Sequence, residues 1–212
     1  MKIQEIIENR GIEEVLHFTT NKGLTGILAT NALKARTHLP EDKYLEYIYK
    51  YNCPDRSRDK EWWEYINLSI TSVNRRLFNI SSGKWHAGED GWWCVLSFAP
   101  EILTHDGVYF ANTNNMYSGV KRMKESEGLE SLFAQRIHQY INSTVQRTAN
   151  CPSNQPTCQQ AEVLYPHELS LNYLTRIYVG SNDTAAKCES IQTIFPIYQK
   201  IPCVLEHDLL EL

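Results

Sequence analysis

A single carboxylate within an apolar strand is the first candidate for chemistry in this chain. Residues 161–165 read Ala-Glu-Val-Leu-Tyr, a short strand pattern with Glu162 as its one acid. Burying a carboxylate is costly unless the group is paired or used in catalysis. Gln160 stands two residues earlier, so we expect its side chain on the same side of the chain as Glu162. The plainer alternative places Glu162 on the solvent face of an edge strand.

A histidine in a second short apolar run is the next candidate. Residues 15–18 read Val-Leu-His-Phe, a strand pattern, and Thr19 lies on the same face as His17. Thr20 or Asn21 can then cap a helix that ends near Asn31. A lone strand histidine is more often a satisfied core residue than a ligand-binding group.

Strict alternation over residues 65–71 predicts a strand with one buried face. Its apolar side chains lie on one side, and Asn67 and Ser69 point to the other. Arg75 and Arg76 follow this strand closely. A guanidinium binds phosphate with two parallel hydrogen bonds, so both are candidate phosphate ligands. A solvated turn is the alternative for this pair.

Length, composition and net charge limit the number of domains and the class of protein. The chain has 212 residues, 42% hydrophobic and 22% charged, with a net charge of −4, which predicts one domain over residues 1–212. This balance excludes a protein held to nucleic acid or to anionic lipid by overall charge alone. There is neither a membrane-spanning stretch nor an uninterrupted signal-peptide core, so we expect a cytoplasmic protein without membrane contact.

Cysteine spacing favours free thiols over a disulfide framework. The six cysteines contain no C-x-x-C pair, and reduced thiols are the rule in the cytoplasm. A zinc site built from Cys151, Cys158 and a histidine is a minor alternative, because the spacing is not typical of zinc ligands. We therefore expect no metal.

The remaining patterns predict an α+β architecture with about six short strands and irregularly placed helices. Such an order is typical of a mixed or mostly antiparallel sheet rather than a doubly wound one. Further strands are expected at 92–98, 108–110, 176–179 and 201–205, and helices at 2–9, 116–141 (broken near Gly128) and 183–193. Residues 40–64 read as a helix interrupted by the turn 52–55, and residues 83–91 and 142–160 read as loops.

Several of these segments together resemble the DarT family of ADP-ribosyltransferase toxins. Leu16-His17-Phe18-Thr19 is similar to the opening motif of that family, and Gln160-Ala161-Glu162-Val163-Leu164 to its catalytic strand. Residues 65–74, 93–98 and 107–115 resemble its other strands, in the right order. The chain departs from the thymidine-modifying branch at residues 68–71 and at Arg75 and Arg76.

The resemblance implies an ADP-ribosyltransferase-like fold whose central sheets form a cleft for NAD+, with flanking helices. It implies that Glu162 and Gln160 are catalytic and that NAD+ is the co-substrate. His17 would hold the adenosine-side ribose, and the main chain near Phe18 the nicotinamide amide. Further NAD+ contacts are expected from Thr19, Asn67, Ser69, Arg75 and Arg76.

The chemistry implied is transfer of ADP-ribose from NAD+ to a nucleobase. Breaking the nicotinamide–ribose bond develops positive charge on the ribose, as in glycoside hydrolysis. A carboxylate stabilises that charge and can take the proton of the attacking base. We expect a toxin of a toxin–antitoxin or phage-defence system that acts on single-stranded nucleic acid, with DNA favoured and an antitoxin as partner. The alternatives are single-stranded RNA, a protein acceptor, or an inactive nucleic-acid-binding module.

A nucleic-acid acceptor needs local basic and aromatic groups, because the net charge does not supply them. Three clusters meet this need: Arg56, Arg58 and Lys60 with Trp62 and Trp63; Arg75, Arg76 and Lys84 with Trp85; and Lys121, Arg122 and Lys124. The polar loop 142–160 precedes the catalytic acid, so its residues Arg147, Asn150 and Gln159 are predicted to read bases.

Overall fold

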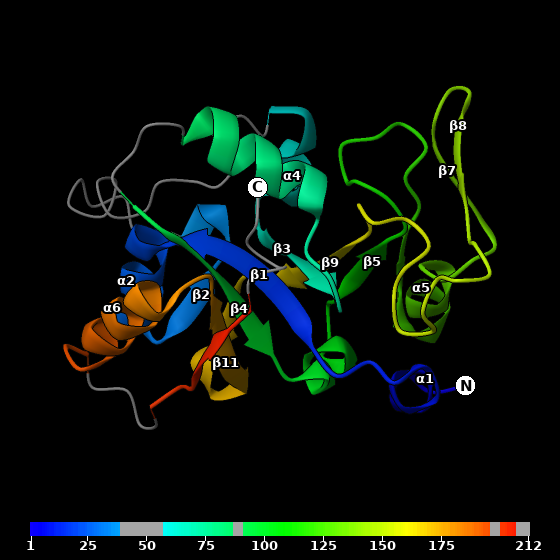
Figure 1. The fold of residues 1–212 in the computed structure, drawn as a ribbon. Coiled ribbons are helices and arrows are strands. Elements are labelled where there is room, and N and C mark those ends of the chain that lie inside the picture. Colours follow the sequence, from blue (N-terminus) through cyan, green and yellow to red (C-terminus); the bar gives the residue numbers. More distant parts are fainter. Residues whose placement is uncertain (39–56, 87–90, 196–199, 207–212) are drawn as a thin grey trace.

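A central sheet of eight strands organises the chain (Figure 1). The computed structural model describes residues 1–38, 57–86, 91–195 and 200–206. The strand order is β12-β11-β4-β1-β3-β9-β5-β6, and every neighbouring pair is antiparallel except β11 with β12. The strands span Val15–Thr20 (β1), Tyr65–Ile70 (β3), Trp93–Phe98 (β4), Tyr109–Ala111 (β5), Arg122–Lys124 (β6), Glu162–Pro166 (β9), Leu174–Val179 (β11) and Cys203–Leu205 (β12).

Helices and two small sheets surround this centre. The α-helices are Ile3–Arg10 (α1), Asn21–Thr30 (α2), Arg75–Ile80 (α4), Glu125–Ser131 (α5) and Asn182–Gln192 (α6). Shorter helical segments cover Arg36–His38, Ser57–Trp62, Ser81–Trp85, Pro100–Thr104 and Leu171–Tyr173. Strand β2 (Ala32–Lys34) pairs with β10 (Glu168–Ser170), and β7 (Arg136–Tyr140) pairs with β8 (Ser143–Gln146) as a hairpin. The predicted α+β architecture is thus confirmed.

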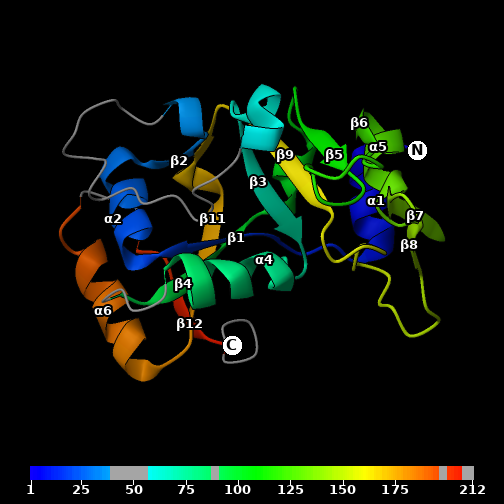
Figure 2. The same cartoon turned by 90° about the horizontal axis from the view of Figure 1, so that it is seen from above.

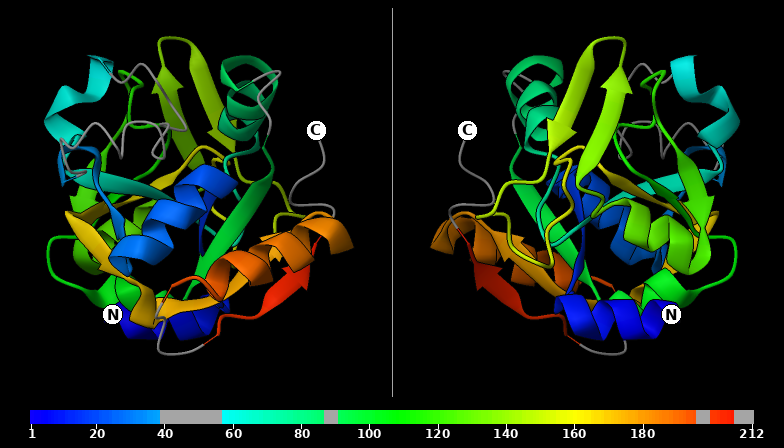
Figure 3. Two further views of the ribbon diagram at one scale, coloured as in Figure 1. Left: turned by 90° about the vertical axis from the view of Figure 1, so that its left-hand side faces the viewer. Right: turned by 90° about the vertical axis from the view of Figure 1, so that its right-hand side faces the viewer.

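The two faces of the sheet carry cores of unequal size. The larger core joins alternate strand residues, such as Leu68 and Val163, to buried side chains of α1, α2, α5 and α6. The smaller cluster joins Leu16, Phe18 and Val95 to Phe78 of α4 on the opposite face. Helix α4 and the β7–β8 hairpin stand on the same side of the molecule (Figures 1 and 3), and Figure 2 shows α4 lying across β4 and β1.

The junction between β1 and β3 divides the sheet into two halves. Strand β1 pairs with β4 along all six of its residues, but its described register with β3 covers only Val15 with Ile70 and Leu16 with Ser69. Beyond Leu16 the two strands diverge. The central sheets expected from the sequence are therefore one continuous sheet that opens in the middle.

The helix after β1 begins and ends where the sequence predicts. The Thr20 hydroxyl accepts a hydrogen bond from the amide of Gly23 at 3.2 Å, which satisfies an orphan donor of the first turn. Asn31 ends the helix in the left-handed conformation, with φ of 53°.

The long helix expected over residues 116–141 is wrong. Only Glu125–Ser131 is α-helical, and strands β6 and β7 flank it. A Cβ at Gly119 would lie 2.7 Å from the carbonyl oxygen of Gln139, and one at Gly128 would lie 2.4 Å from that of Met123. These glycines permit close approach of the main chain rather than breaking a helix.

Other local expectations are also corrected. Residues 75–85 are helical, so Arg75 and Arg76 lie in the first turn of α4 rather than in a free turn, and the expected loop 83–91 begins inside this helical segment. The polar stretch 142–160 begins with strand β8. The expected turn 52–55 lies outside the described residues, and Ser57–Trp62 is a 3-10 helix. Within the described ranges, twelve strands replace the expected six or so, and several of them are only three residues long.

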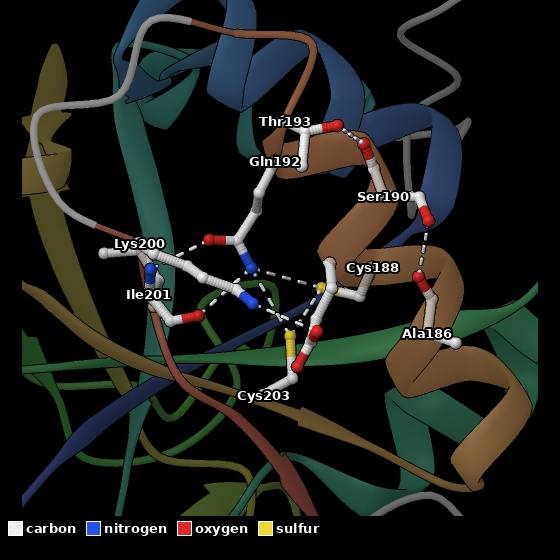
Figure 4. A network of polar contacts seen from close by, with 9 residues as sticks. Ala186, Cys188, Ser190, Gln192, Thr193, Lys200, Ile201 and Cys203 are labelled. Atoms are coloured by element: carbon white, nitrogen blue, oxygen red, sulfur yellow. Dashed lines mark hydrogen bonds and ion pairs between the residues drawn. The ribbon is translucent and has the colours of Figure 1, made fainter.

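A buried glutamine fastens the C-terminal strand to α6 (Figure 4). The Gln192 side chain accepts from the amide of Ile201 at 2.8 Å and donates to its carbonyl oxygen at 3.0 Å. Its amide also contacts the sulfurs of Cys188 and Cys203, which are free thiols. The Gln192 side chain therefore makes with Ile201, just before β12, the pair of hydrogen bonds that a neighbouring strand would make.

We predict that Gln192→Leu lowers the free energy of unfolding by about 1–3 kcal/mol, because both main-chain groups of buried Ile201 lose their partner. Chemical denaturation measures this difference. Ser190→Ala, which removes an exposed hydroxyl on the same helix, is the matched control and should change stability by less than about 0.5 kcal/mol. Equal stability of the two variants would contradict the fastening role.

Candidate active site

Glu162 is a buried carboxylate in the interior of the sheet. It begins β9, which lies between β3 and β5, and only 5% of its surface is exposed. Val163 joins the large core, so alternation places Glu162 on the opposite face, the face of α4. The edge-strand alternative is therefore wrong, because β9 has a neighbour on each side and its acid is shielded from solvent.

Two neutral donors hold the same oxygen of this carboxylate. Oε2 accepts from Nδ2 of Asn67 at 2.8 Å and from the main-chain amide of Asn115 at 3.2 Å. Asn67 belongs to β3, and Asn115 lies in the segment after β5, so the donors come from both sides of β9. Hydrogen bonds to an ionised acceptor are stronger than neutral ones. They offset part of the cost of burying the charge and fix its orientation.

His17 connects to this carboxylate through Asn67. Its Nδ1 lies 3.1 Å from the main-chain oxygen of Asn67, and this contact crosses the opening between β1 and β3. Burial lowers the pKa of His17 to about 4, and the hydrogen bond to the Asn67 carbonyl opposes this shift only in part. The ring is therefore neutral at pH 7. Since a carbonyl can only accept, Nδ1 carries the proton, and Nε2 is left as an acceptor.

Gln160 precedes the strand that Glu162 begins. It lies in the turn before β9, where its side-chain oxygen accepts from the Tyr117 hydroxyl at 2.9 Å. The Tyr117 ring meets that of Tyr140 edge to face, with centroids 5.2 Å apart. The predicted same-side projection of Gln160 and Glu162 stays a prediction, because Gln160 lies in the turn before β9 and strand alternation begins only at Glu162. Through Tyr117, Gln160 links the turn before β9 to Tyr140 of the β7–β8 hairpin.

The other residues proposed for NAD+ contacts are spread around this centre. Phe18 packs its ring edge to face on Phe78. Thr19 is buried against α2, where a Cβ at Gly23 would lie 2.1 Å from its hydroxyl. Ser69 is half-buried and lies on the same face of β3 as Asn67. The structure brings Asn67 to Glu162 directly and His17 through Asn67; it does not bring Thr19 to them.

Arg75 and Arg76 lie on the correct face of the sheet for a ligand near Glu162. Both stand in the first turn of α4, whose N-cap Asn74 accepts from the amide of Leu77 at 3.1 Å. Arg75 is half-buried and Arg76 is exposed. Their binding of phosphate stays a prediction.

Aromatic rings and basic groups gather on the flank of the sheet beside Glu162. Trp62, Tyr65 and Tyr109 contact one another with centroids 5.0 to 5.8 Å apart. The ammonium of Lys124 lies 4.5 Å from the Tyr109 ring centroid, and the guanidinium of Arg122 lies 5.0 Å from that of Trp62. Half-buried rings next to cations are suited to stacking bases of a single strand. We call these five residues the aromatic flank.

Arg147 directs its guanidinium to groups of its own segment, and its base-reading role stays a prediction. Its guanidinium donates to the carbonyl oxygens of Gln155 and Pro152, and to the hydroxyl of Thr157. It therefore organises the segment that leads to β9. Asn150 and Gln159 are exposed on the same segment, and their base-reading role stays a prediction.

The family model described as ssDNA thymidine ADP-ribosyltransferase, DarT, matches residues 16–202. The chain belongs to the DarT family. The family assignment, the enzyme class and the use of NAD+ expected from the sequence are thereby confirmed.

Solved DarT structures share this fold at low sequence identity. DarT of Thermus sp. 2.9 in complex with ADP-ribosylated ssDNA is 14% identical, with a TM-score of 0.68 and coverage of 94% of this chain and 96% of that chain. The same protein with carba-NAD+ is 15% identical, with a TM-score of 0.66 and coverage of 93% of this chain and 97% of that chain. Thermosipho africanus DarTG in complex with ADP-ribose is 15% identical, with a TM-score of 0.64. The match covers 94% of this chain and 51% of that chain. No curated protein gives a significant match.

Two negative findings apply to the described part of this DarT chain. Over residues 1–38, 57–86, 91–195 and 200–206, no three histidine, cysteine or acidic side chains gather as metal ligands, Cys151 and Cys158 included. Within the same ranges, each helix is too short or too polar to cross a bilayer.

The half-buried, neutral His17 predicts a pH-dependent stability for this DarT chain. Its folded pKa of about 4 lies below the unfolded value of about 6.5. The unfolded chain therefore binds a proton that the folded chain resists, and stability falls as pH drops through this window. The stability difference between wild type and His17→Asn should fall by about 2–3 kcal/mol from pH 7.5 to pH 4.5.

Urea unfolding of both chains at the two pH values measures this difference. His138→Asn reports the contribution of an exposed imidazole on β7. A wild-type advantage that stays constant between the two pH values would contradict a neutral His17.

Proposed function

We propose that residues 1–212 act as one domain that transfers ADP-ribose from NAD+ to a base of single-stranded DNA, with thymidine as the first candidate. The observation that carries this proposal is the buried Glu162 carboxylate, held by Asn67 and Asn115 on the face of α4. The description of the family as ssDNA thymidine ADP-ribosyltransferase supports the choice of acceptor.

The reaction breaks the bond between nicotinamide and ribose and forms a bond between ribose and a base nitrogen. Nicotinamide leaves with the electron pair of the broken bond, and the ribose becomes cationic. Glu162 stabilises this cation through the ribose 2′-hydroxyl and accepts the proton that the attacking nitrogen loses. Since Oε2 is fixed by two donors, the charge is oriented before the substrate arrives.

NAD+ recognition follows from the chain near the opening between β1 and β3. The unprotonated Nε2 of His17 accepts a hydrogen bond from a hydroxyl of the adenosine-side ribose, and the main chain near Phe18 binds the nicotinamide amide. Ser69 supplies a further small polar contact, whereas Thr19, buried against α2, would need to move to reach NAD+. Arg75 and Arg76 pair with the diphosphate through their guanidinium groups. Asn67, in addition to any ribose contact, orients Glu162.

The acceptor strand lies along the aromatic flank. Stacking on Trp62, Tyr65 and Tyr109 tolerates any base, and Lys124 supplies positive charge for the backbone. A single strand is favoured because the attacked base must be unpaired and unstacked. RNA differs from DNA by its 2′-hydroxyl, so an RNA acceptor is the main competing outcome.

Incubation with labelled NAD+ and matched acceptors tests this proposal. We predict that wild type labels single-stranded DNA and that duplex DNA, single-stranded RNA and a protein extract stay unlabelled. Glu162→Gln should reduce labelling by at least about 10³-fold, since it removes the negative charge from the transition state. Glu127→Gln, an exposed acid on α5, is the matched control and should label like wild type. Label on RNA or protein alone would replace the DNA assignment, and full labelling by Glu162→Gln would remove the acid from catalysis.

We also propose that this activity serves a toxin–antitoxin or phage-defence system in the cytoplasm. The likeness to a DarTG protein, of which the chain covers 51%, supports an antitoxin that opposes the transferase. Modification of template bases would block copying of the strand, which is a toxic outcome for a growing cell.

We predict that induction of wild type in a bacterial host arrests growth and that Glu162→Gln at equal expression does not. Growth curves and immunoblots measure the two quantities. Normal growth of cells that contain folded, active wild-type enzyme would contradict the toxin role while leaving the transferase activity intact.

A further inference from the structure

Arg122 holds the residue whose amide binds the catalytic carboxylate. Its Nε donates to the side-chain oxygen of Asn115, and its Nη2 donates to the main-chain oxygen of the same residue at 2.6 Å. One planar guanidinium thus binds both carbonyl groups of Asn115. This two-point contact fixes the side chain and the peptide plane of that residue together.

Asn115 transmits this constraint to Glu162. Its main-chain amide donates to Oε2 of Glu162 at 3.2 Å, and only 2% of its surface is exposed. The amide direction depends on the conformation of the segment between β5 and β6. Arg122 is the first residue of β6 and follows this segment directly. Its bonds to Asn115 therefore connect the end of the segment to its middle.

The Trp62 ring holds the guanidinium from another element. The Arg122 guanidinium carbon lies 5.0 Å from the Trp62 centroid, and the side chain is half-buried. A guanidinium can stack on an aromatic ring and donate two parallel hydrogen bonds at once, whereas an ammonium is a point charge. Arginine is therefore specifically suited to this position, and lysine is not.

We propose that Arg122 is a positioning residue that orients Glu162 through Asn115. This inference rests on the proposed function, in which Glu162 stabilises the cationic ribose. Loss of the two-point contact frees the Asn115 amide to turn away from Oε2. The carboxylate then loses one of its two described donors and its fixed direction, which affects the transition state more than the binding of NAD+.

The test compares Arg122→Lys with wild type on the single-stranded DNA that wild type labels. We predict a decrease in kcat of about 10- to 100-fold, a KM for NAD+ within a factor of two of wild type, and an unchanged melting temperature. Arg136→Lys on β7, an exposed arginine, is the matched control and should retain the wild-type kcat.

A second variant guards against a folding defect. Asn115→Ala removes the side-chain acceptor but keeps the main-chain carbonyl and the amide that faces Glu162. It should lower kcat less than Arg122→Lys, again without raising KM for NAD+. A charge-only role predicts full activity for Arg122→Lys, and a phosphate-binding role predicts a raised KM for NAD+ or DNA; either result would overturn the proposal.

Glu162→Gln is assayed in parallel to separate the two hypotheses. Loss of labelling by Glu162→Gln together with wild-type kinetics of Arg122→Lys would refute only the positioning role. Retained labelling by Glu162→Gln would refute the catalytic assignment on which that role depends.

Discussion

The buried charge of Glu162 is the constraint on which the geometry of the site depends. A carboxylate with 5% exposure needs hydrogen-bond donors within the fold. Those donors come from β3, through the Asn67 side chain, and from the segment after β5, through the Asn115 amide. The order β3-β9-β5 is therefore more than a way to complete a sheet. It encloses the acid between two donors and keeps its charge directed to one face.

The same residue of β3 also controls the middle of the sheet. The side chain of Asn67 meets Glu162, while its main-chain oxygen receives the His17 ring across the opening between β1 and β3. A shift of one residue along β3 would turn Asn67 into the large core and bring an apolar side chain to the carboxylate. The short pairing of β1 with β3 therefore has to be held in register by the alternating apolar face of β3, in which Ile66, Leu68 and Ile70 are all buried.

The sequence predicts those parts of the fold whose signal is local. Strict alternation defined β3, and one acid among apolar residues singled out Glu162 before any neighbour was known. The β7–β8 hairpin was missed because its strands are mostly exposed and polar, which in sequence resembles a loop or a helix face. Helix α4 is not predicted, because its six residues, Arg75–Ile80, are too few to show a helical period. The role of Arg122 could not be predicted, since its partners are a main-chain carbonyl seven residues away and a tryptophan from another element.

The polar segment 142–160 before β9 is held by hydrogen bonds within itself and to the end of β3. Its one described arginine, Arg147, uses its donors on the carbonyls of its own segment, and Thr71 donates to the Asn154 carbonyl at 2.9 Å. The Thr71 bond ties the segment to the end of β3, and the Arg147 bonds fix the conformation of the chain that leads into β9. In the proposed function, positive charge for the acceptor strand comes from Lys124, which lies beside the rings of the aromatic flank. Stacking tolerates every base, so selection of one base has to arise where the base meets Glu162, at the point where reaction geometry is fixed.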